Sequence, residues 1–91
     1  MIRVKKILEV NSYEVSCLFN NGLVKKINLL PIIEKQNHLN GIEKLKDEAY
    51  FKTVKIGIFG EIFWENTIKS DNEFWNYDLS PEFIFHNGEV V

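Results

Sequence analysis

The chain has 91 residues, of which 45% are hydrophobic and 13% aromatic, and this predicts one folded domain, residues 1–91, and not a disordered segment. Its formal net charge is −2, its apolar runs are far shorter than a membrane span, and the first residues lead into an expected strand without a signal-peptide core. The single cysteine excludes an internal disulfide. Together these features predict a cytoplasmic protein without a membrane anchor.

The charge is distributed unevenly along the chain. Residues 1–60 contain ten Lys or Arg and six Asp or Glu, whereas residues 61–91 contain one Lys and seven acidic residues. The two parts can pack together and neutralise each other, or the acidic end can meet a basic partner or a second copy of the chain. The sequence leaves both possibilities open.

The clearest element is a hairpin formed by residues 13–19 and 23–29. Apolar and polar side chains alternate along the first of these segments, which is typical of a strand with one buried face. A two-residue loop would pair Val15 with a polar residue, whereas a three-residue loop pairs it with Ile27. We expect the three-residue loop, because it also places Gly22 at a left-handed turn position where glycine has no steric penalty.

A third strand is expected upstream, over residues 2–10, where apolar residues fall at even-numbered positions. A two-residue turn at Asn11-Ser12 would join it to the hairpin and complete a three-stranded meander with one apolar face. The expected pairs are Val4 with Phe19, Leu8 with Val15 and Val10 with Tyr13.

Short helices follow the meander. Pro31 favours the start of a helix through residue 36, and of the two residues near its N-cap, Asn28 and Leu30, Asn28 has the better side chain. A second helical face begins at Ile42. Asp47 is the expected N-cap of one more turn.

A second hairpin is predicted from two further apolar segments, Thr53–Ile58 and Glu61–Asn66. A loop at residues 59–61 aligns the apolar faces of both segments and places a basic residue opposite an acidic one on the other face. The expected pairs are Ile58 with Ile62, Ile56 with Trp64 and Lys55 with Glu65.

The C-terminal part contains a polar and then aromatic stretch, residues 67–77, followed by a clear helix start. Ser80 is the expected N-cap and Pro81 the first helical residue. Asn87-Gly88 ends this helix, and residues 89–91 are expected to fray. The predicted fold class is α+β, with a small antiparallel sheet (the N-terminal three-stranded meander plus a second hairpin) and two or three short helices.

Several short motifs are distributed over most of the chain: Phe19-Asn20-Asn21-Gly22, Ile27-Asn28-Leu29, Leu45-Lys46-Asp47 with Phe51 and Val54, Ile62-Phe63-Trp64-Glu65-Asn66, and Asp78-Leu79-Ser80-Pro81-Glu82-Phe83-Ile84. Together they resemble the small bacterial domain-of-unknown-function family 2442. The resemblance implies an α+β domain with antiparallel strands, whose members occur alone, fused to helix-turn-helix segments, or beside another small gene in a toxin–antitoxin-like arrangement. It implies no catalytic residues. Asn28 stands where that family typically has aspartate, and residues 67–77 look like an insertion.

One candidate for nucleophilic chemistry is Cys17, which the expected register places in one row with Lys6 and Lys25. Neighbouring ammonium groups lower a thiol pKa and favour the thiolate. No His or Asp is placed to act as its base, so the alternative is a small buried thiol flanked by solvated lysines. We expect no catalytic residue.

The other titratable residues form no recognisable metal or cofactor motif. The two histidines, His38 and His86, lack the spacing of zinc ligands, and His86 suits the C-terminal end of a helix. Asp78 and Glu82 are four residues apart and could bind a cation, but they also suit the N-terminus of a helix. We expect no metal and no cofactor.

The outer face of the meander is expected to be basic. Such a face could bind nucleic acid, but it contains no aromatic side chain and the isoelectric point is about 5.6, so nucleic acid is the less favoured partner. An apolar trio within this face would also fit a protein partner, self-association or cover by the C-terminal segment. The basic residues are Arg3, Lys5 and Lys26, and the apolar trio is Ile7, Leu18 and Val24.

The candidate partner-binding residues are Phe74, Trp75, Tyr77 and Asp78, because aromatic side chains in a polar stretch are typical of interfaces. The alternative is a hydrophobic lid over a small core. The sequence therefore predicts a non-enzymatic protein–protein interaction module, with the antitoxin-like role that the resemblance implies. A nucleic-acid-binding accessory and a small enzyme are the alternatives.

Overall fold

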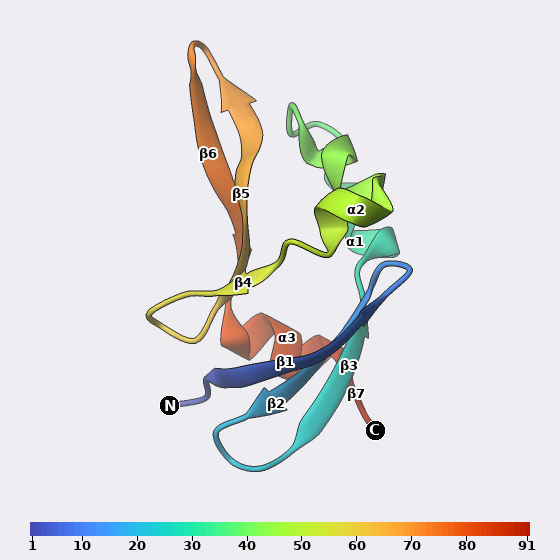
Figure 1. Cartoon of the computed structure of the whole chain (residues 1–91), viewed down its shortest axis with the longest axis vertical. Coiled ribbons are helices and arrows are strands. Elements are labelled where there is room, and N and C mark those ends of the chain that lie inside the picture. The colour runs from blue at the N-terminus through green and yellow to red at the C-terminus, as the bar shows by residue number, and fades with distance from the viewer.

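Two antiparallel sheets and four short helical segments make up the computed structural model, which describes residues 1–91 (Figure 1). The first sheet has the order β1-β2-β3-β7 and the second the order β4-β5-β6. The α+β class is therefore confirmed. The strands are β1 (Val4–Asn11), β2 (Glu14–Phe19), β3 (Val24–Asn28), β4 (Lys55–Ile56), β5 (Ile62–Ser70), β6 (Glu73–Leu79) and β7 (Glu89–Val90), and the helical segments are α1 (Leu30–Lys35), the 3-10 helix η1 (Ile42–Lys46), α2 (Glu48–Phe51) and α3 (Pro81–Asn87).

The predicted register between β2 and β3 is confirmed. Val15 lies opposite Ile27, and the Phe19 N–H donates to the Leu23 carbonyl at 2.9 Å across a three-residue loop. Gly22 occupies the left-handed region with φ of 89°. Glycine adopts this backbone without a steric penalty, which explains why the loop has this length.

The predicted register between β1 and β2 is wrong beyond Val4, which does pair with Phe19. The turn is Ser12-Tyr13 and not Asn11-Ser12, and both of its residues have positive φ, 21° and 73°. Two irregularities in β1 absorb the resulting shift. In place of the predicted pairs, Val10 lies opposite Val15, and Leu8, which has no partner in the ladder, is exposed.

The C-terminal tail was predicted to fray, and this prediction is wrong. The tail forms β7 on the free edge of β3. Lys25 pairs with Val90 and Lys26 with Glu89, and the Val91 N–H donates to the Val24 carbonyl at 3.1 Å. These backbone hydrogen bonds hold the tail, since the valine side chains are exposed.

The helices α2 and α3 begin at the predicted capping residues, whereas α1 has neither of its two expected N-cap residues at the N-cap position. The Asn28 side chain accepts the N–H of Leu30 at 3.0 Å just before α1, although Leu29 holds the N-cap position itself. Asp47 accepts the Ala49 N–H at 3.0 Å, and Ser80 caps α3 by accepting the Phe83 N–H at 3.1 Å.

The second sheet differs most from the prediction. β4 has only two residues, and it pairs Ile56 with Ile62 because residues 57–61 form the loop. Ile58, which was expected in this strand, lies in that loop and is 80% exposed. The ion pair of Lys55 with Glu65 forms nevertheless, diagonally across the strands. β5 continues to Ser70 and turns back as β6, a strand that the sequence did not predict.

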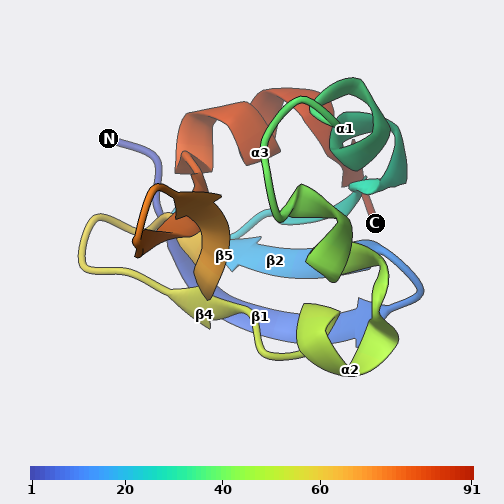
Figure 2. The same ribbon diagram turned by 90° about the horizontal axis from the view of Figure 1, so that it is seen from above.

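The core lies between the two sheets and the helical segments, as Figure 2 shows from above. Trp64 is at its centre, fully buried between the rings of Phe51 and Tyr77 at centroid distances of 5.4 and 6.1 Å. Its indole N–H donates to the Phe51 carbonyl at 2.8 Å, so its polar atom is satisfied. No helix is long and apolar enough to span a membrane.

Candidate functional site

The hairpin of β5 and β6 has two different halves. We call residues 62–64 and 77–79 the hairpin base and residues 68–75 the hairpin tip. In the base, the side chains that face the core are buried. In the tip, Phe74 is 50% and Trp75 56% exposed. Figure 1 shows that the tip extends away from the first sheet, so the hairpin carries aromatic side chains outside the core.

The two halves join at an irregularity where three residues of β5 lie opposite Asn76 of β6. Asn66 has a φ of 53°, and its N–H donates to the Asn76 side chain at 3.2 Å. The buried Thr67 hydroxyl lies 2.7 Å from the Tyr50 hydroxyl and 3.2 Å from the Trp64 carbonyl. These contacts fix the direction in which the tip leaves the core.

The loop before η1 supports the same junction. Gly41, with φ of 104°, packs so closely that a Cβ there would lie 2.1 Å from the Thr67 carbonyl oxygen. The Lys69 N–H donates to the Asn40 carbonyl at 2.8 Å. The edge of β5 that faces the helical segments is therefore occupied at this point.

The four predicted partner-binding residues do not form one surface. Side chains alternate along a strand, so Trp75 and Tyr77 point to one side of β6 and Phe74 and Asp78 to the other. Tyr77 is only 7% exposed, and its hydroxyl donates to the Gln36 side chain. Tyr77 is therefore a core residue, as the hydrophobic-lid alternative expected, and the site keeps three of the four residues.

The two exposed aromatic side chains have different surroundings. The Lys44 ammonium lies 4.6 Å from the centre of the Phe74 ring, a cation–π distance that links the tip to η1. Trp75 makes no aromatic or cation–π contact and lies opposite Ile68. Of the two aromatic side chains, Trp75 thus has more surface available for a partner.

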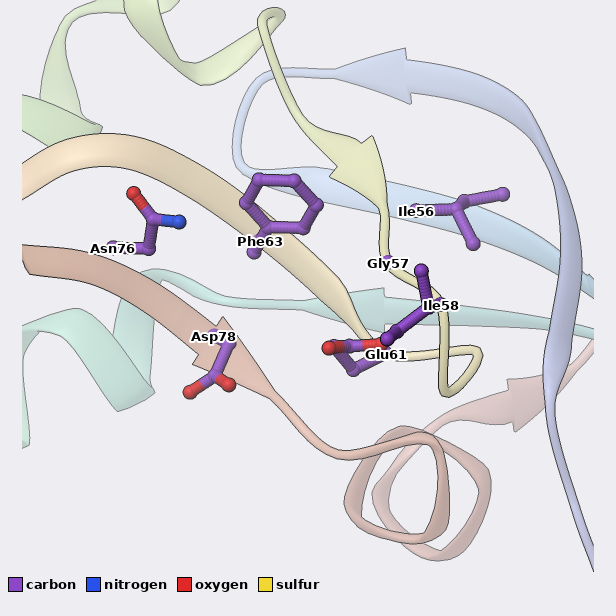
Figure 3. A pocket seen from close by; sticks show the side chains of 7 residues that line it. All are labelled: Ile56, Gly57, Ile58, Glu61, Phe63, Asn76 and Asp78. Atoms are coloured by element: carbon purple, nitrogen blue, oxygen red, sulfur yellow. The ribbon is translucent and has the colours of Figure 1, made fainter.

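A pocket of about 340 Å³ opens on the outer side of the second sheet, beside Asp78 (Figure 3). The Glu61 carboxylate accepts the Phe59 N–H at 3.0 Å, while the Asp78 carboxylate accepts no hydrogen bond, and neither acid has an ion-pair partner. The pocket therefore combines an apolar lining with two uncompensated carboxylates. Its lining residues are Ile56, Gly57, Ile58, Glu61, Phe63, Asn76 and Asp78.

The electrostatic effect of Asp78 is visible at its neighbour. Burial raises the pKa of Tyr77 above its usual value, and the negative charge of Asp78 adds to this effect. Asp78 itself is exposed. A cation that approached this side of the sheet would meet the carboxylates of Asp78 and Glu61 together.

The sequence predicts that Cys17 lies in one row with Lys6 and Lys25, and the structure confirms only Lys25. The Cys17 thiol is also not in a reactive environment. Lys6 lies opposite Leu18, and Ile7 takes the place beside Cys17. Lys25 does lie opposite Cys17, but its ammonium donates to the Phe85 carbonyl at 2.5 Å. Cys17 is fully buried, and burial raises the pKa of its thiol to about 11. The alternative of a small buried thiol describes it.

The basic face of the first sheet contains other residues than the sequence predicts. Because of the irregularities in β1, both Lys5 and Lys6 are exposed, whereas Ile7 packs against the core and leaves this face. Lys26 lies 4.0 Å from Glu14, which partly compensates it. His86 lies in the last turn of α3, as expected, and no three metal-ligating side chains gather anywhere in the chain.

No family model, no curated protein and no solved structure matches this chain. The resemblance to family 2442 therefore stays a prediction.

Sequence reasoning missed β6 and the residues that this strand brings together. The sequence predicts Glu61 and Phe63 in a hairpin but gives no sign of a pocket, and it points to no role for Asn76. A signal was available: after the polar turn at residues 71–72, apolar side chains recur at every second position from Trp75 to Leu79. This period of two indicates a strand with one buried face.

Proposed function

We propose that the chain is a protein–protein interaction module and that the hairpin tip is its partner-binding element. The observation that carries this proposal is the exposure of Phe74 and Trp75 on a hairpin whose base is rigidly packed. Exposed aromatic side chains on a preorganised support are typical centres of protein interfaces, because their burial contributes affinity while little conformational entropy is lost. A partner encoded beside this chain, as in the toxin–antitoxin-like arrangement that the resemblance implies, fits this function.

The test is capture of the partner by the tagged full chain from a lysate of the host, followed by mass spectrometry. The double variant Phe74→Ser/Trp75→Ser removes both aromatic side chains of the tip. The matched control is Leu8→Ser, because Leu8 is 47% exposed but lies on the first sheet. We expect a stoichiometric partner with the wild type and the control, and its loss with the double variant.

Two results would contradict the proposal. Retention of the partner by the double variant would remove the tip from the interface. Loss of the partner with Leu8→Ser alone would place the interface on the first sheet. The melting temperatures of all three proteins show that any lost binding does not reflect unfolding.

A second candidate is nucleic-acid binding by the outer face of the first sheet. The observation that favours it is the exposure of Lys5 and Lys6 side by side at an irregularity of β1. No aromatic side chain of this sheet is available there for base stacking, so this candidate ranks second. Binding of a labelled oligonucleotide that falls steeply with salt and is lost in Lys5→Gln/Lys6→Gln would support it.

The third alternative, a small enzyme, rested on Cys17 and Asp78. The buried thiol of Cys17 is not accessible to a substrate. Asp78 is accessible, but its pocket contains no histidine, and Glu61 is the only other carboxylate there, so the two do not make up a group of three metal-ligating side chains. The geometry offers no nucleophile with a base, and the interaction module remains the proposal that the side chains support best.

A further inference from the structure

β6 is the edge strand of the second sheet, and its far side has no backbone partner. All backbone hydrogen bonds of residues 73–79 are made to β5, and no loop or helix bonds to the other edge. In Figure 1, β6 forms the outer side of the hairpin, away from the helical segments of residues 30–51. A row of peptide groups is thus open to an additional strand.

The orientation of these peptide groups follows from Lys69. Its N–H points away from β6, to the Asn40 carbonyl, so its partner Phe74 likewise directs its N–H and carbonyl away from β5. The alternation along the strand gives Asn76 and Asp78 the same orientation. These three residues present the donors and acceptors that an incoming strand would use.

Proteins usually protect such an edge with lysines, prolines, bulges or a covering segment. β6 has none of these, because the irregularity of the hairpin lies in β5 and the only proline nearby, Pro81, follows the strand. Four consecutive residues, 73–76, are exposed along it, including both aromatic side chains of the tip. The only charged side chains on this edge, Glu73 and Asp78, are acidic, so the edge is open to strand addition by a basic segment.

The side chains beside this edge define the sequence that would fit. On the outer side lie the uncompensated carboxylates of Asp78 and Glu61, next to the pocket. On the opposite side lies Trp75, which offers an apolar surface. An added strand alternates its side chains between the two sides, so basic residues would alternate with apolar ones.

A second copy of this chain fits the edge poorly. Pairing of β6 with β6 would bring together two segments from residues 61–91, each with one Lys and seven acidic residues. Like charges opposite each other in a sheet are destabilising. A basic segment has the complementary charge and no such repulsion.

We propose that an extended, basic segment of a partner protein adds to the free edge of β6 as a fourth strand of the second sheet, with a lysine or arginine side chain in the pocket beside Asp78. This inference rests on the proposed function and specifies its binding mode. The backbone of Phe74, Asn76 and Asp78 supplies the hydrogen bonds, and the pocket and Trp75 read alternate side chains of the added strand.

The probe is a soluble peptide, acetyl-Ser-Val-Arg-Val-Arg-Val-Ser-amide, titrated into the isotope-labelled full chain and followed by amide NMR. We expect shifts along residues 73–79 and around the pocket, with slower exchange of the Phe74 and Asp78 amides. The same peptide with citrulline in place of arginine keeps the backbone but lacks the charge, and it should bind about tenfold more weakly.

Two variants separate the pocket from general electrostatics. Asp78→Asn keeps the shape of the strand and should weaken the arginine peptide about tenfold while leaving the citrulline peptide unaffected. Asp71→Asn is the matched control, because Asp71 lies in the turn with φ of 53°, a conformation that asparagine also adopts. This control should bind the peptide like the wild type.

The proposal is overturned if the shifts map to another surface, if both peptides bind equally, or if the free chain dimerises through β6 in light scattering and NMR. Its failure is distinguishable from failure of the proposed function. Suppose that Phe74→Ser/Trp75→Ser loses the captured partner, while the peptides do not shift the amides of β6 and Asp78→Asn still captures the partner. In that case the tip is the interface, but strand addition is not its binding mode.

Discussion

The two tryptophans of this chain lie on the same hairpin and have opposite roles. Trp64, in the base, is 0% exposed, packs between two aromatic rings and has its N–H hydrogen-bonded. Trp75, in the tip, is 56% exposed and makes no ring–ring contact with another aromatic side chain. The same residue type therefore stabilises the fold in one half and presents apolar surface to solvent in the other.

The difference shows how a domain of 91 residues can hold an exposed aromatic side chain in a fixed position. The hairpin base is built into the core, and the junction at Thr67 is hydrogen-bonded to Tyr50 and contacted by Gly41. The tip thus needs no core of its own to keep its direction. Stability and recognition are separated along one pair of strands.

The strongest way to break this comparison is to remove the indole of the base. Trp64→Ala leaves a large cavity at the centre of the core and an unpaired Phe51 carbonyl, so we expect the free energy of unfolding to fall by about 3 to 5 kcal/mol. Denaturant unfolding followed by circular dichroism measures the change. An effect below about 1 kcal/mol would contradict the central position of Trp64.

The junction is tested by Gly41→Ala. The new Cβ would overlap the Thr67 carbonyl and the backbone has φ of 104°, so we expect a loss of about 2 to 3 kcal/mol. Gly22→Ala is the control, because Gly22 also has positive φ but nothing lies within 4 Å of its added Cβ. If both variants lose the same stability, the close contact at Thr67 contributes nothing.

Alkaline pH should destabilise the folded protein through two buried groups, the Cys17 thiol and the Tyr77 hydroxyl. Burial raises the pKa of Cys17 from 9.0 to about 11 and that of Tyr77 from 10.0, so the folded state holds these protons more tightly than the unfolded state. The contribution of these two groups to the free energy of unfolding is complete below their ordinary pKa values. It is lost as the pH rises through their pKa values in the folded state. For the thiol alone the loss is about 2 kcal/mol.

Unfolding curves between pH 8 and 11 measure this loss. The variant Cys17→Ala should be less stable at pH 8 but should show a smaller decline with pH, because the thiol no longer titrates. A wild-type stability that is constant over this range, or that rises, would contradict the burial of Cys17 and Tyr77.

How much of this could be read from the sequence depends on whether the signal was local. The β2–β3 register was predictable, because the apolar alternation and the glycine of a three-residue loop agree. The helix starts at Asp47 and Ser80 were predictable for the same reason, since a capping side chain bonds within its own turn.

The errors occurred where the backbone departs from regular pairing. The turn at Ser12-Tyr13 places two non-glycine residues at positive φ, a choice that local propensity disfavours and that the irregularities of β1 accommodate. β7 depends on backbone contacts with β3, which are distant in the sequence. No local sequence pattern predicts the turn at Ser12-Tyr13 or the strand β7.

The candidate site was half predictable. The aromatic residues of the tip were found by composition, but their separation into exposed Phe74 and Trp75 and buried Tyr77 requires the strand and its register. The pocket beside Asp78 forms only because residues 57–61 fold as a loop across the sheet. The pocket brings residues 56–61 next to residues 76 and 78, and no local sequence pattern predicts this contact.

The smallest expected effect on stability belongs to the most informative variant, Trp75→Ala. Its unfolding free energy and its capture of the partner should be measured on one preparation, beside the wild type. We predict a change in stability within about 0.5 kcal/mol, because the side chain is mainly exposed, together with loss of the partner. A loss of about 2 kcal/mol or more would make Trp75 a core residue like Trp64, and unchanged capture would remove the tip from the interface. Either result would contradict the separation of stability and recognition along this hairpin.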